Sequence, residues 1–454
     1  MHHDLVSPDH IRSLFAQAMS EMYRTEVPLY GTLMALVAKV NADTLAAQPA
    51  LEAQLLRNDE RARLDAERHG AIRVGTAEEL SMLRRAFAVM GMSPVGYYDL
   101  SVAGVPVHST AFRATSAAAL AANPFRVFTS LLRMELIDDA DLRAQAQAIL
   151  ARRDIFTAGA RALVEQAERD GGLSEAHAHR FVAEVLETFR WHSQATVSHA
   201  TYQALSQAHR LIADVVSFRG PHINHLTPRT LDIDAAQEEM LRLGIDAKAV
   251  IEGPPRRAVP ILLRQTSFKA LEEAVAFPDG DHRQAGTHTA RFGEIEQRGL
   301  ALTPKGRALY DQLLDAARDD GKGSTGSDYP MRLAQAFADF PDDLDTLRRE
   351  GLGYFRYALT ERGLAMPKSD RQELSPEALI EAGLASADPI VYEDFLPVSA
   401  AGIFQSNLGG TEQHAYAANA SREAFEAALG APVLDEFALY AQLEAESLES
   451  LHAG

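Results

Sequence analysis

The chain of 454 residues contains no cysteine. That absence excludes disulfide bonds, thiolate zinc sites, cysteine-ligated iron–sulfur clusters and cysteine nucleophiles. Any metal ion bound by this protein must therefore be held mainly by histidine and carboxylate side chains. The sequence supplies both, with 16 histidines and 63 acidic residues.

Positive charge and long hydrophobic runs are also scarce. Lys and Arg number 44 against 63 Asp and Glu, which gives a formal net charge of −19. Nucleic acids and anionic membranes attract positive surfaces, so neither is an expected partner, although a local basic pocket for a small anion is compatible with this charge. The N-terminal MHHDL lacks the pattern of a signal peptide, and no run approaches the roughly 18 apolar residues of a membrane helix. We expect a cytoplasmic protein.

Helical patterns dominate the chain. Thr76-Ala77-Glu78-Glu79 is a capping box, with Thr76 as the N-cap and Glu79 three residues later. Residues 139–213 are helical in pattern almost throughout, so we interpret them as a helical insertion within one large catalytic domain spanning residues 1–454. The Gly- and Ser-rich residues 319–328 predict a flexible surface loop. Further helices are expected at residues 27–41, 45–57, 331–337, 344–361, 422–429 and 435–451.

Strands are predicted where β-branched and aromatic residues run between turn residues. Such runs alternate with helices along the chain, which indicates an α+β fold. The expected strands cover residues 95–100, 105–112, 125–134, 215–218, 223–233, 259–263 and 288–299.

One candidate for chemistry is the pair His69 and Arg73. If their segment is a strand, both side chains lie on one face, because side chains alternate with a period of two. An imidazole beside a guanidinium suits an anion bound to a metal: the metal binds one end, and Arg73 grips a carboxylate through two parallel hydrogen bonds. The alternative is a loop with two unrelated polar residues.

A second candidate is GPHINHLTPR at residues 220–229, which holds two histidines. Pro221 and Pro228 disfavour a helix and predict extended backbone. His222 and His225 lie three residues apart and would face opposite sides of a strand, so only one of them is expected to bind a metal. The spacing does not distinguish them.

The third candidate is a carboxylate in residues 288–299. A carboxylate that points into a core must be paired or bound to a metal, because burying it alone is costly. Glu294 and Glu296 both qualify, and Glu296 beside Arg298 is equally well explained as a surface ion pair. In a single strand, one face would carry His288, Ala290, Phe292, Glu294 and Glu296.

Two histidines and one carboxylate are the ligand set of many non-haem Fe(II) oxygenases, whose open positions accept a 2-oxo acid and O₂. Zinc hydrolases use the same set. The ligands alone therefore leave three hypotheses open: an oxygenase, a metal-dependent hydrolase, lyase or isomerase, and a non-enzymatic protein that binds a small acid.

Four long strings resemble the 2-oxoadipate dioxygenase/decarboxylase family, also called 2-hydroxyglutarate synthases. The resemblance extends from Val6 to the C-terminal helix. The strings are ERHGAIRVG at residues 67–75, GPHINHLTPR at 220–229, RFGEIEQRG at 291–299 and YEDFLPVSAAGIF at 392–404.

This resemblance implies a vicinal-oxygen-chelate-like fold, with a curved, mostly antiparallel sheet around a metal site and extensive helical additions. By match of motif it assigns Arg73 to a substrate carboxylate, and it assigns Val398 and Ser399 to the distal carboxylate. It implies that Fe(2+) is bound by His69, His225 and Glu294, which leaves His222 as a structural or supporting residue. The implied reaction turns 2-oxoadipate and O₂ into 2-hydroxyglutarate and CO₂ in lysine catabolism.

Overall fold

The computed structural model describes residues 5–318, 329–396 and 413–453. The expected surface loop at 319–328 and the two expected substrate contacts Val398 and Ser399 lie outside these residues. Among the helices described, none is both long enough and apolar enough to cross a membrane.

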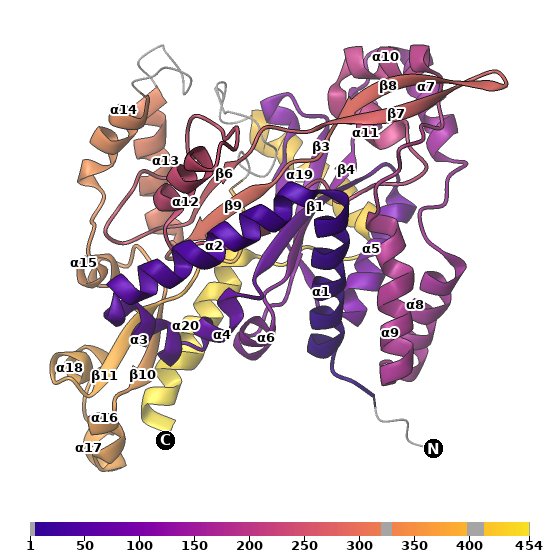
Figure 1. Cartoon of the computed structure of the whole chain (residues 1–454). Coiled ribbons are helices and arrows are strands. Elements are labelled where there is room, and N and C mark those ends of the chain that lie inside the picture. Colours follow the sequence, from indigo (N-terminus) through magenta and orange to yellow (C-terminus); the bar gives the residue numbers. More distant parts are fainter. Residues whose placement is uncertain (1–4, 319–328, 397–412, 454) are drawn as a thin grey trace.

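A mixed five-stranded sheet stands at the centre of the fold (Figure 1). Its strand order is β2-β3-β4-β1-β5. β1 runs parallel to β4, and the other three pairings are antiparallel. The α+β class expected from the sequence is confirmed. The strands are β1 (Arg68–Val74), β2 (Ser93–Asp99), β3 (Val107–Arg113), β4 (Arg126–Leu132) and β5 (Leu226–Pro228).

Both faces of this sheet are buried, and alternate residues of one strand enter different cores. Ile72 and Val74 of β1 join a core formed with α1 (Pro8–Glu26) and α5 (Ala77–Val89). Ala71 joins a second core on the other face. His69 and Arg73 have the same parity as Ala71 and therefore lie on that second face.

The helix predicted from the capping box is α5. The Thr76 hydroxyl accepts a hydrogen bond from the backbone N–H of Glu79 at 3.2 Å. The Glu79 carboxylate accepts from the N–H of Gly75 at 2.8 Å, one residue before the cap, and it also pairs with Arg153. The cap is thereby confirmed, and it joins β1 to α5 directly after the site-bearing strand.

Residues 139–213 contain five α-helices that pack against the rest of the fold: α7 (Ala140–Leu150), α8 (Ala158–Asp170), α9 (Glu175–Leu186), α10 (His199–Ala208) and α11 (Arg210–Val216). Leu163 of α8 and Phe181 of α9 belong to the core shared with α1 and α5. The other described α-helices are α2 (Pro28–Ala47), α3 (Pro49–Arg57), α4 (Glu60–Leu64), α6 (Ala117–Ala122), α12 (Ile233–Arg242), α13 (Pro304–Arg318), α14 (Tyr329–Ala336), α15 (Leu344–Arg349), α16 (Glu361–Ala365), α17 (Lys368–Gln372), α18 (Pro376–Glu381), α19 (Gln413–Leu429) and α20 (Glu436–Ala453).

The predicted strand at residues 288–299 is wrong as a single element. Its first part ends β8 (His282–Thr289), which forms a hairpin with β7 (Glu272–Asp279). Its second part is β9 (Glu294–Arg298), which pairs with β6 (Leu263–Ser267). Residues 290–293 between them belong to no strand, so His288 and Glu294 lie on different strands and do not share one strand face.

Other strand predictions also need correction. Residues 215 and 216 end helix α11, whose N-terminus is capped by the His209 side chain, and Phe218 forms only an isolated bridge with Ala195. The strand expected at residues 223–233 shrinks to β5, because Asp232 caps α12 directly afterwards. β6 begins only at the end of residues 259–263, after Leu262 adopts a positive φ of 52°.

The helix predicted at residues 344–361 ends early. α15 stops at Arg349, and Gly351 follows with a left-handed φ of +65°. Glycine adopts this conformation without the steric penalty of a side chain, so it terminates the helix. The chain then forms β10 (Phe355–Leu359), which pairs with β11 (Ala385–Pro389).

Gly299, the residue after β9, packs tightly against the backbone of Pro260. A Cβ atom there would lie 2.2 Å from the backbone oxygen of Pro260, which cannot move without shifting the chain. We expect Gly299→Ala to lower the free energy of unfolding by about 2 kcal/mol or more. Gly220→Ala is the control, because its Cβ would meet no atom closer than 3.7 Å, and the change should stay within about 0.5 kcal/mol. Urea denaturation measures both, and equal losses would contradict the prediction.

Candidate metal centre

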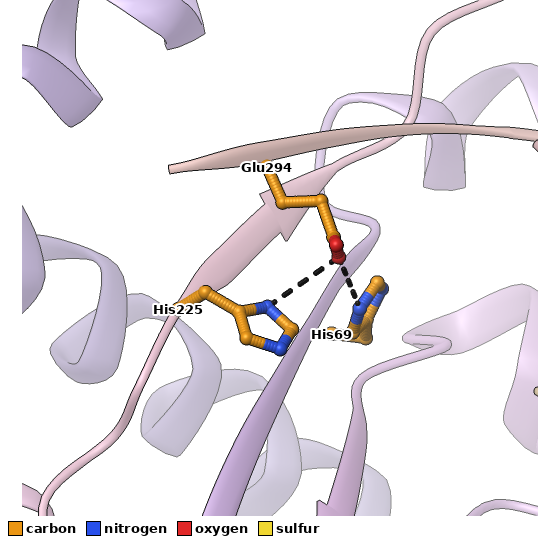
Figure 2. A group of neighbouring side chains, drawn as sticks. All are labelled: His69, His225 and Glu294. Carbon is orange, nitrogen blue, oxygen red and sulfur yellow. Dashed lines mark ion pairs between the residues drawn. The ribbon is translucent and has the colours of Figure 1, made fainter. Parts of the chain in front are cut away.

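Three side chains predicted from the sequence meet in the interior: His69, His225 and Glu294 (Figure 2). His69 Nε2 lies 3.1 Å from Glu294 Oε2, and His225 Nδ1 lies 3.5 Å from the same oxygen. One ligand atom from each residue falls within 4.8 Å of the other two. All three residues are buried, and they form the single group of this kind within the described part of the chain.

Strand pairing explains why these distant residues meet. β5 pairs antiparallel with β1, with Leu226 opposite Gly70, so His225 arrives beside His69. Gly70 permits this approach, because a Cβ atom there would lie 3.1 Å from the carbonyl oxygen of His225. A bridge between Arg229 and Glu296 then places β9 next to the end of β5.

The spacing of these atoms fits a metal ion. Ligand atoms about 2.0–2.2 Å from a metal lie roughly 3 Å from one another around it, close to the separations observed here. Glu294 is also oriented by two donors, the Thr227 hydroxyl at 3.0 Å and the Gln265 amide at 2.8 Å. Two imidazoles and one oriented carboxylate could therefore hold a divalent cation with further positions open.

The protonation states favour such a cation. Burial lowers the pKa of His225 to about 4, so its ring is neutral and offers a lone pair. Burial raises the pKa of Glu294, but His225 and His69 outweigh it and the pKa falls below the usual range. Burial likewise lowers the pKa of His69, and the carboxylates of Glu296 and Glu294 reverse this shift and raise it. The ionised Glu294 and the neutral His225 ring together attract a positive ion, which would displace the proton that the raised pKa favours on His69.

Glu296 lies on the opposite side of the His69 ring from Glu294. Its Oε2 is 2.9 Å from His69 Nδ1, while Arg298 donates to both Glu296 oxygens at 2.9 Å. The pair Glu296–Arg298 expected on the surface is therefore present but fully buried. Burial raises the pKa of Glu296, but Arg298 and His69 outweigh it and lower it to about 2. The ionised Glu296 favours a proton on the nearby Nδ1 of His69 by its charge, without the geometry of a hydrogen bond, and Nε2 faces Glu294.

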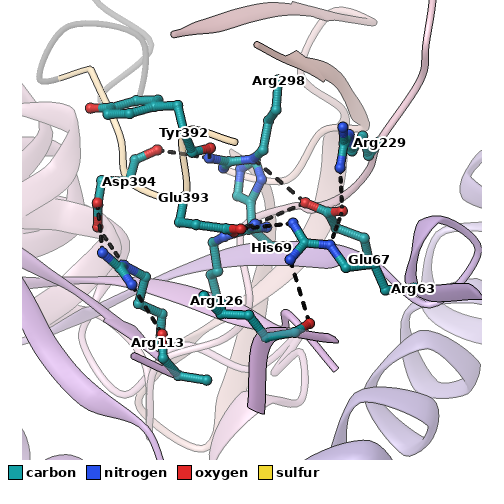
Figure 3. Close-up of polar contacts among 12 residues, drawn as sticks. Arg63, Glu67, His69, Arg113, Arg126, Arg229, Arg298, Tyr392, Glu393 and Asp394 are labelled. Atoms are coloured by element: carbon teal, nitrogen blue, oxygen red, sulfur yellow. Dashed lines mark hydrogen bonds and ion pairs between the residues drawn. The ribbon is translucent and has the colours of Figure 1, made fainter. Parts of the chain in front are cut away.

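A layer of buried ion pairs extends from Glu296 (Figure 3). Arg126 lies 3.9 Å from Glu296 and donates to Glu67 at 2.8 Å and also to Glu393. Glu67 in turn accepts from Arg229 at 3.0 Å. No sequence pattern indicated this layer of ion pairs, although Glu67, Arg229 and Glu393 all lie in the four strings that carry the family resemblance. The layer comprises Arg63, Glu67, Arg113, Arg126, Arg229, Glu296, Arg298, Glu393 and Asp394.

Arg73 lies on the same face of β1 as His69, as the strand period predicted. Its Nη1 donates to Asp214 Oδ2 at 2.9 Å. A small cavity beside it is lined by Ala71, Phe128 and Ser130. Asp214 lies on α11, in a segment predicted to precede a strand, so no sequence pattern indicated this contact.

The two histidines of residues 220–229 have different partners, although both precede β5 and neither lies in a strand. His225 faces Glu294, while His222 lies 3.6 Å from Asp214 and 3.1 Å from the Asn224 amide. Burial lowers the pKa of His222 to about 3, so the ring is neutral. His222 thus contacts the partner of Arg73 and stays outside the cluster of three.

Comparison with known proteins matches nearly the whole chain. A family model described as 2-oxoadipate dioxygenase/decarboxylase matches residues 15–407. A Pseudomonas putida protein of that name is 61% identical over 451 residues, covering 98% of this chain and 97% of the relative. An Escherichia coli protein of the same name is 60% identical over 442 residues, covering 97% and 98%.

A solved structure agrees as closely. The crystal structure of the hydroxyglutarate synthase from Pseudomonas putida in complex with 2-oxoadipate has a TM-score of 0.91 and 59% identity to this protein, covering 99% of this chain and 98% of the other. The match includes the strands that carry the buried cluster. The chain belongs to the 2-oxoadipate dioxygenase/decarboxylase family.

Proposed function

We propose that this protein converts 2-oxoadipate and O₂ into 2-hydroxyglutarate and CO₂, with Fe(2+) held by His69, His225 and Glu294. The observation that carries the proposal is the buried cluster of these three side chains in a chain about 60% identical to named 2-oxoadipate dioxygenase/decarboxylases. The reaction balances, because both oxygen atoms of O₂ enter the products and the six-carbon acid loses one carbon as CO₂.

Fe(2+) held by His69, His225 and Glu294 would supply the Lewis-acid and redox chemistry that the 2-oxo acid and O₂ require. The protein side chains orient these components. The charge of Glu296, 2.9 Å from His69 Nδ1, would favour the proton on that nitrogen and leave Nε2 for the metal. Thr227 and Gln265 hold the Glu294 carboxylate, and the burial of the cluster limits access of water.

Arg73 is proposed to bind a substrate carboxylate, with Val398 and Ser399 contacting the distal one. A diacid approaching a chain of net charge −19 needs such local donors. Arg73 is suited to this role because it shares a strand face with His69 and remains 16% exposed in an otherwise buried region. The proposal includes a curved, vicinal-oxygen-chelate-like sheet around the metal, a cytoplasmic location and a place in lysine catabolism.

Turnover should require both Fe(2+) and O₂. Protein reconstituted with Fe(2+) should consume O₂ when 2-oxoadipate is added and release one CO₂ per O₂, and a chelator should abolish this. His225→Ala should lose bound iron and at least about 99% of the activity, since one of the proposed protein ligands is missing. His179→Ala is the matched control, because His179 is an exposed histidine on α9. An O₂ electrode and a metal assay measure both.

Two results would contradict this prediction. Product formation without O₂ would instead indicate a hydrolase, lyase or isomerase that uses the metal as a Lewis acid. Tight binding of 2-oxoadipate by the iron-loaded protein, without CO₂ release, would indicate a binding protein.

Substitution of the two glutamates of β9 should affect iron binding to different extents. Glu294→Ala should abolish iron binding, because it removes a proposed ligand. Glu296→Gln should keep some iron but lower the affinity by about 10–100-fold, since it disturbs the group that orients His69. Metal titration of both variants provides the measurement. Stronger metal loss in Glu296→Gln than in Glu294→Ala would reverse the assignment.

Substitution of Arg73 should impair use of the substrate without loss of iron. Arg73→Ala should retain iron and lower kcat/KM by about 100-fold, in keeping with the roughly 1.5–3 kcal/mol of a hydrogen bond to a charged group. Arg57→Ala is the control, because Arg57 makes a comparable aspartate pair at 2.9 Å on a different part of the fold. Iron content and steady-state kinetics are measured together. Loss of iron in Arg73→Ala would instead show that Arg73 is structural.

A further inference from the structure

A buried polar chain lies behind Arg73 and includes none of the proposed metal ligands. Asp214 accepts through both carboxylate oxygens: Oδ2 from Arg73 Nη1 at 2.9 Å, and Oδ1 from His288 Nε2 at 2.9 Å. His288 Nδ1 lies 2.9 Å from the hydroxyl of Tyr202. These residues come from β1, α11, β8 and α10, which lie together where the β7–β8 hairpin meets the helices (Figure 1).

The chemistry of the carboxylate fixes one proton of this chain. An ionised carboxylate can only accept, so His288 Nε2 carries a proton and donates to Asp214. His288 Nδ1 is hydrogen-bonded to the Tyr202 hydroxyl. The rings of Trp191 and Phe218 flank His288, with centroids 6.1 Å and 4.9 Å away. The imidazole is thus held from both nitrogens and by two neighbouring rings.

Asp214 stays ionised in this environment. Burial raises its pKa, but His222, His288 and Arg73 outweigh this effect and hold the pKa far below the usual range. Arg73 is its fully charged partner. Among the described residues, Arg73 makes its side-chain hydrogen bond to Asp214, through one of its five N–H groups.

We propose that Asp214 is a positioning residue that fixes the Arg73 guanidinium for a substrate carboxylate, and that His288 and Tyr202 fix Asp214. This inference rests on the proposed role of Arg73. A long arginine side chain loses rotational freedom when it binds a ligand, and a partner that fixes it in advance reduces that loss. With Nη1 on Asp214, the remaining N–H groups, for which the described part of the chain shows no acceptor, can meet a carboxylate in a set orientation.

Charge supports positioning over simple attraction. The Asp214 carboxylate offsets the positive charge of Arg73, so the pair attracts an anion less than a free guanidinium would. The benefit of Asp214 must therefore come from geometry. If attraction dominated, removing the negative charge would strengthen substrate binding, and the two roles predict opposite signs.

A double-mutant cycle tests this proposal. Binding of 2-oxoadipate to the iron-loaded protein is measured without O₂ by calorimetry, with the emission of Trp191, the single tryptophan, as a second reading. We expect Asp214→Asn to raise the Kd about tenfold. We expect the same change to have no further effect in the Arg73→Ala background, because Asp214 acts through Arg73. KM should rise with the Kd.

Two other variants complete the experiment. Tyr202→Phe removes only the hydroxyl that holds His288, so it should weaken binding by a few-fold and keeps the test valid if Asp214→Asn does not fold. Asp388→Asn is the matched control: Asp388 pairs with Arg57 at 2.9 Å on β11, at the other end of the molecule (Figure 1), and should leave the Kd unchanged.

The outcomes are distinct. An unchanged or lower Kd in Asp214→Asn overturns the proposal, as does an equal loss in the wild-type and Arg73→Ala backgrounds. If the wild type binds 2-oxoadipate without turnover, the proposed reaction fails while the binding cycle still decides the role of Asp214. If the wild type does not bind 2-oxoadipate, Arg73 has no such carboxylate to hold and both proposals fall.

Discussion

The structure depends on the pairing of carboxylates that are buried beside the central sheet. Glu67, Glu296 and Glu393 are withdrawn from water, and each faces at least one buried arginine. An uncompensated charge in this position would cost several kcal/mol, so these ion pairs constrain which segments can lie next to one another. They join β1, β4, β9 and the segment before residue 397. His69 is adjacent to the same layer, because Glu296 contacts both His69 and Arg298.

Side chains of β1 alternate between the apolar core and the polar face that holds the candidate metal centre. Ile72 and Val74 of β1 enter the apolar core, while His69 and Arg73 point to the other face. The same strand therefore packs into the core with one face and presents His69 and Arg73, four positions apart, on the other. A shift of one residue in its register would exchange the two sets, which the buried core prevents.

Local periodicity made part of this site predictable. It placed His69 and Arg73 on one face of β1, which is confirmed. His222 and His225 lie near different carboxylates, Asp214 and Glu294, but residues 221–225 form no strand, so strand alternation does not account for their separation. The choice of Glu294 over Glu296 came from the family resemblance, because spacing treats the two alike. The structure separates them by position: Glu294 faces both histidines, and Glu296 faces the far nitrogen of His69.

Other features could not be predicted, for identifiable physical reasons. The β7–β8 hairpin is exposed along most of β8, so it lacks the apolar alternation that reveals a strand. The early end of α15 depends on the backbone conformation of Gly351, which outweighs the helical pattern around it. Asp214 meets Arg73 only because α11 packs against β1, and contacts between distant segments leave no local pattern.

The charges around Arg73 indicate how an acidic protein can select a diacid. The net charge of −19 repels anions at long range, and Asp214 offsets Arg73 at short range. Salt screens the first effect over roughly 10 Å, but the second acts within hydrogen-bond distance. In the proposed role of Arg73, binding would then rely on N–H groups held in a fixed orientation, which favour a carboxylate of the correct geometry over other anions. Selectivity in such a site follows from the position of the donors and depends little on the total charge.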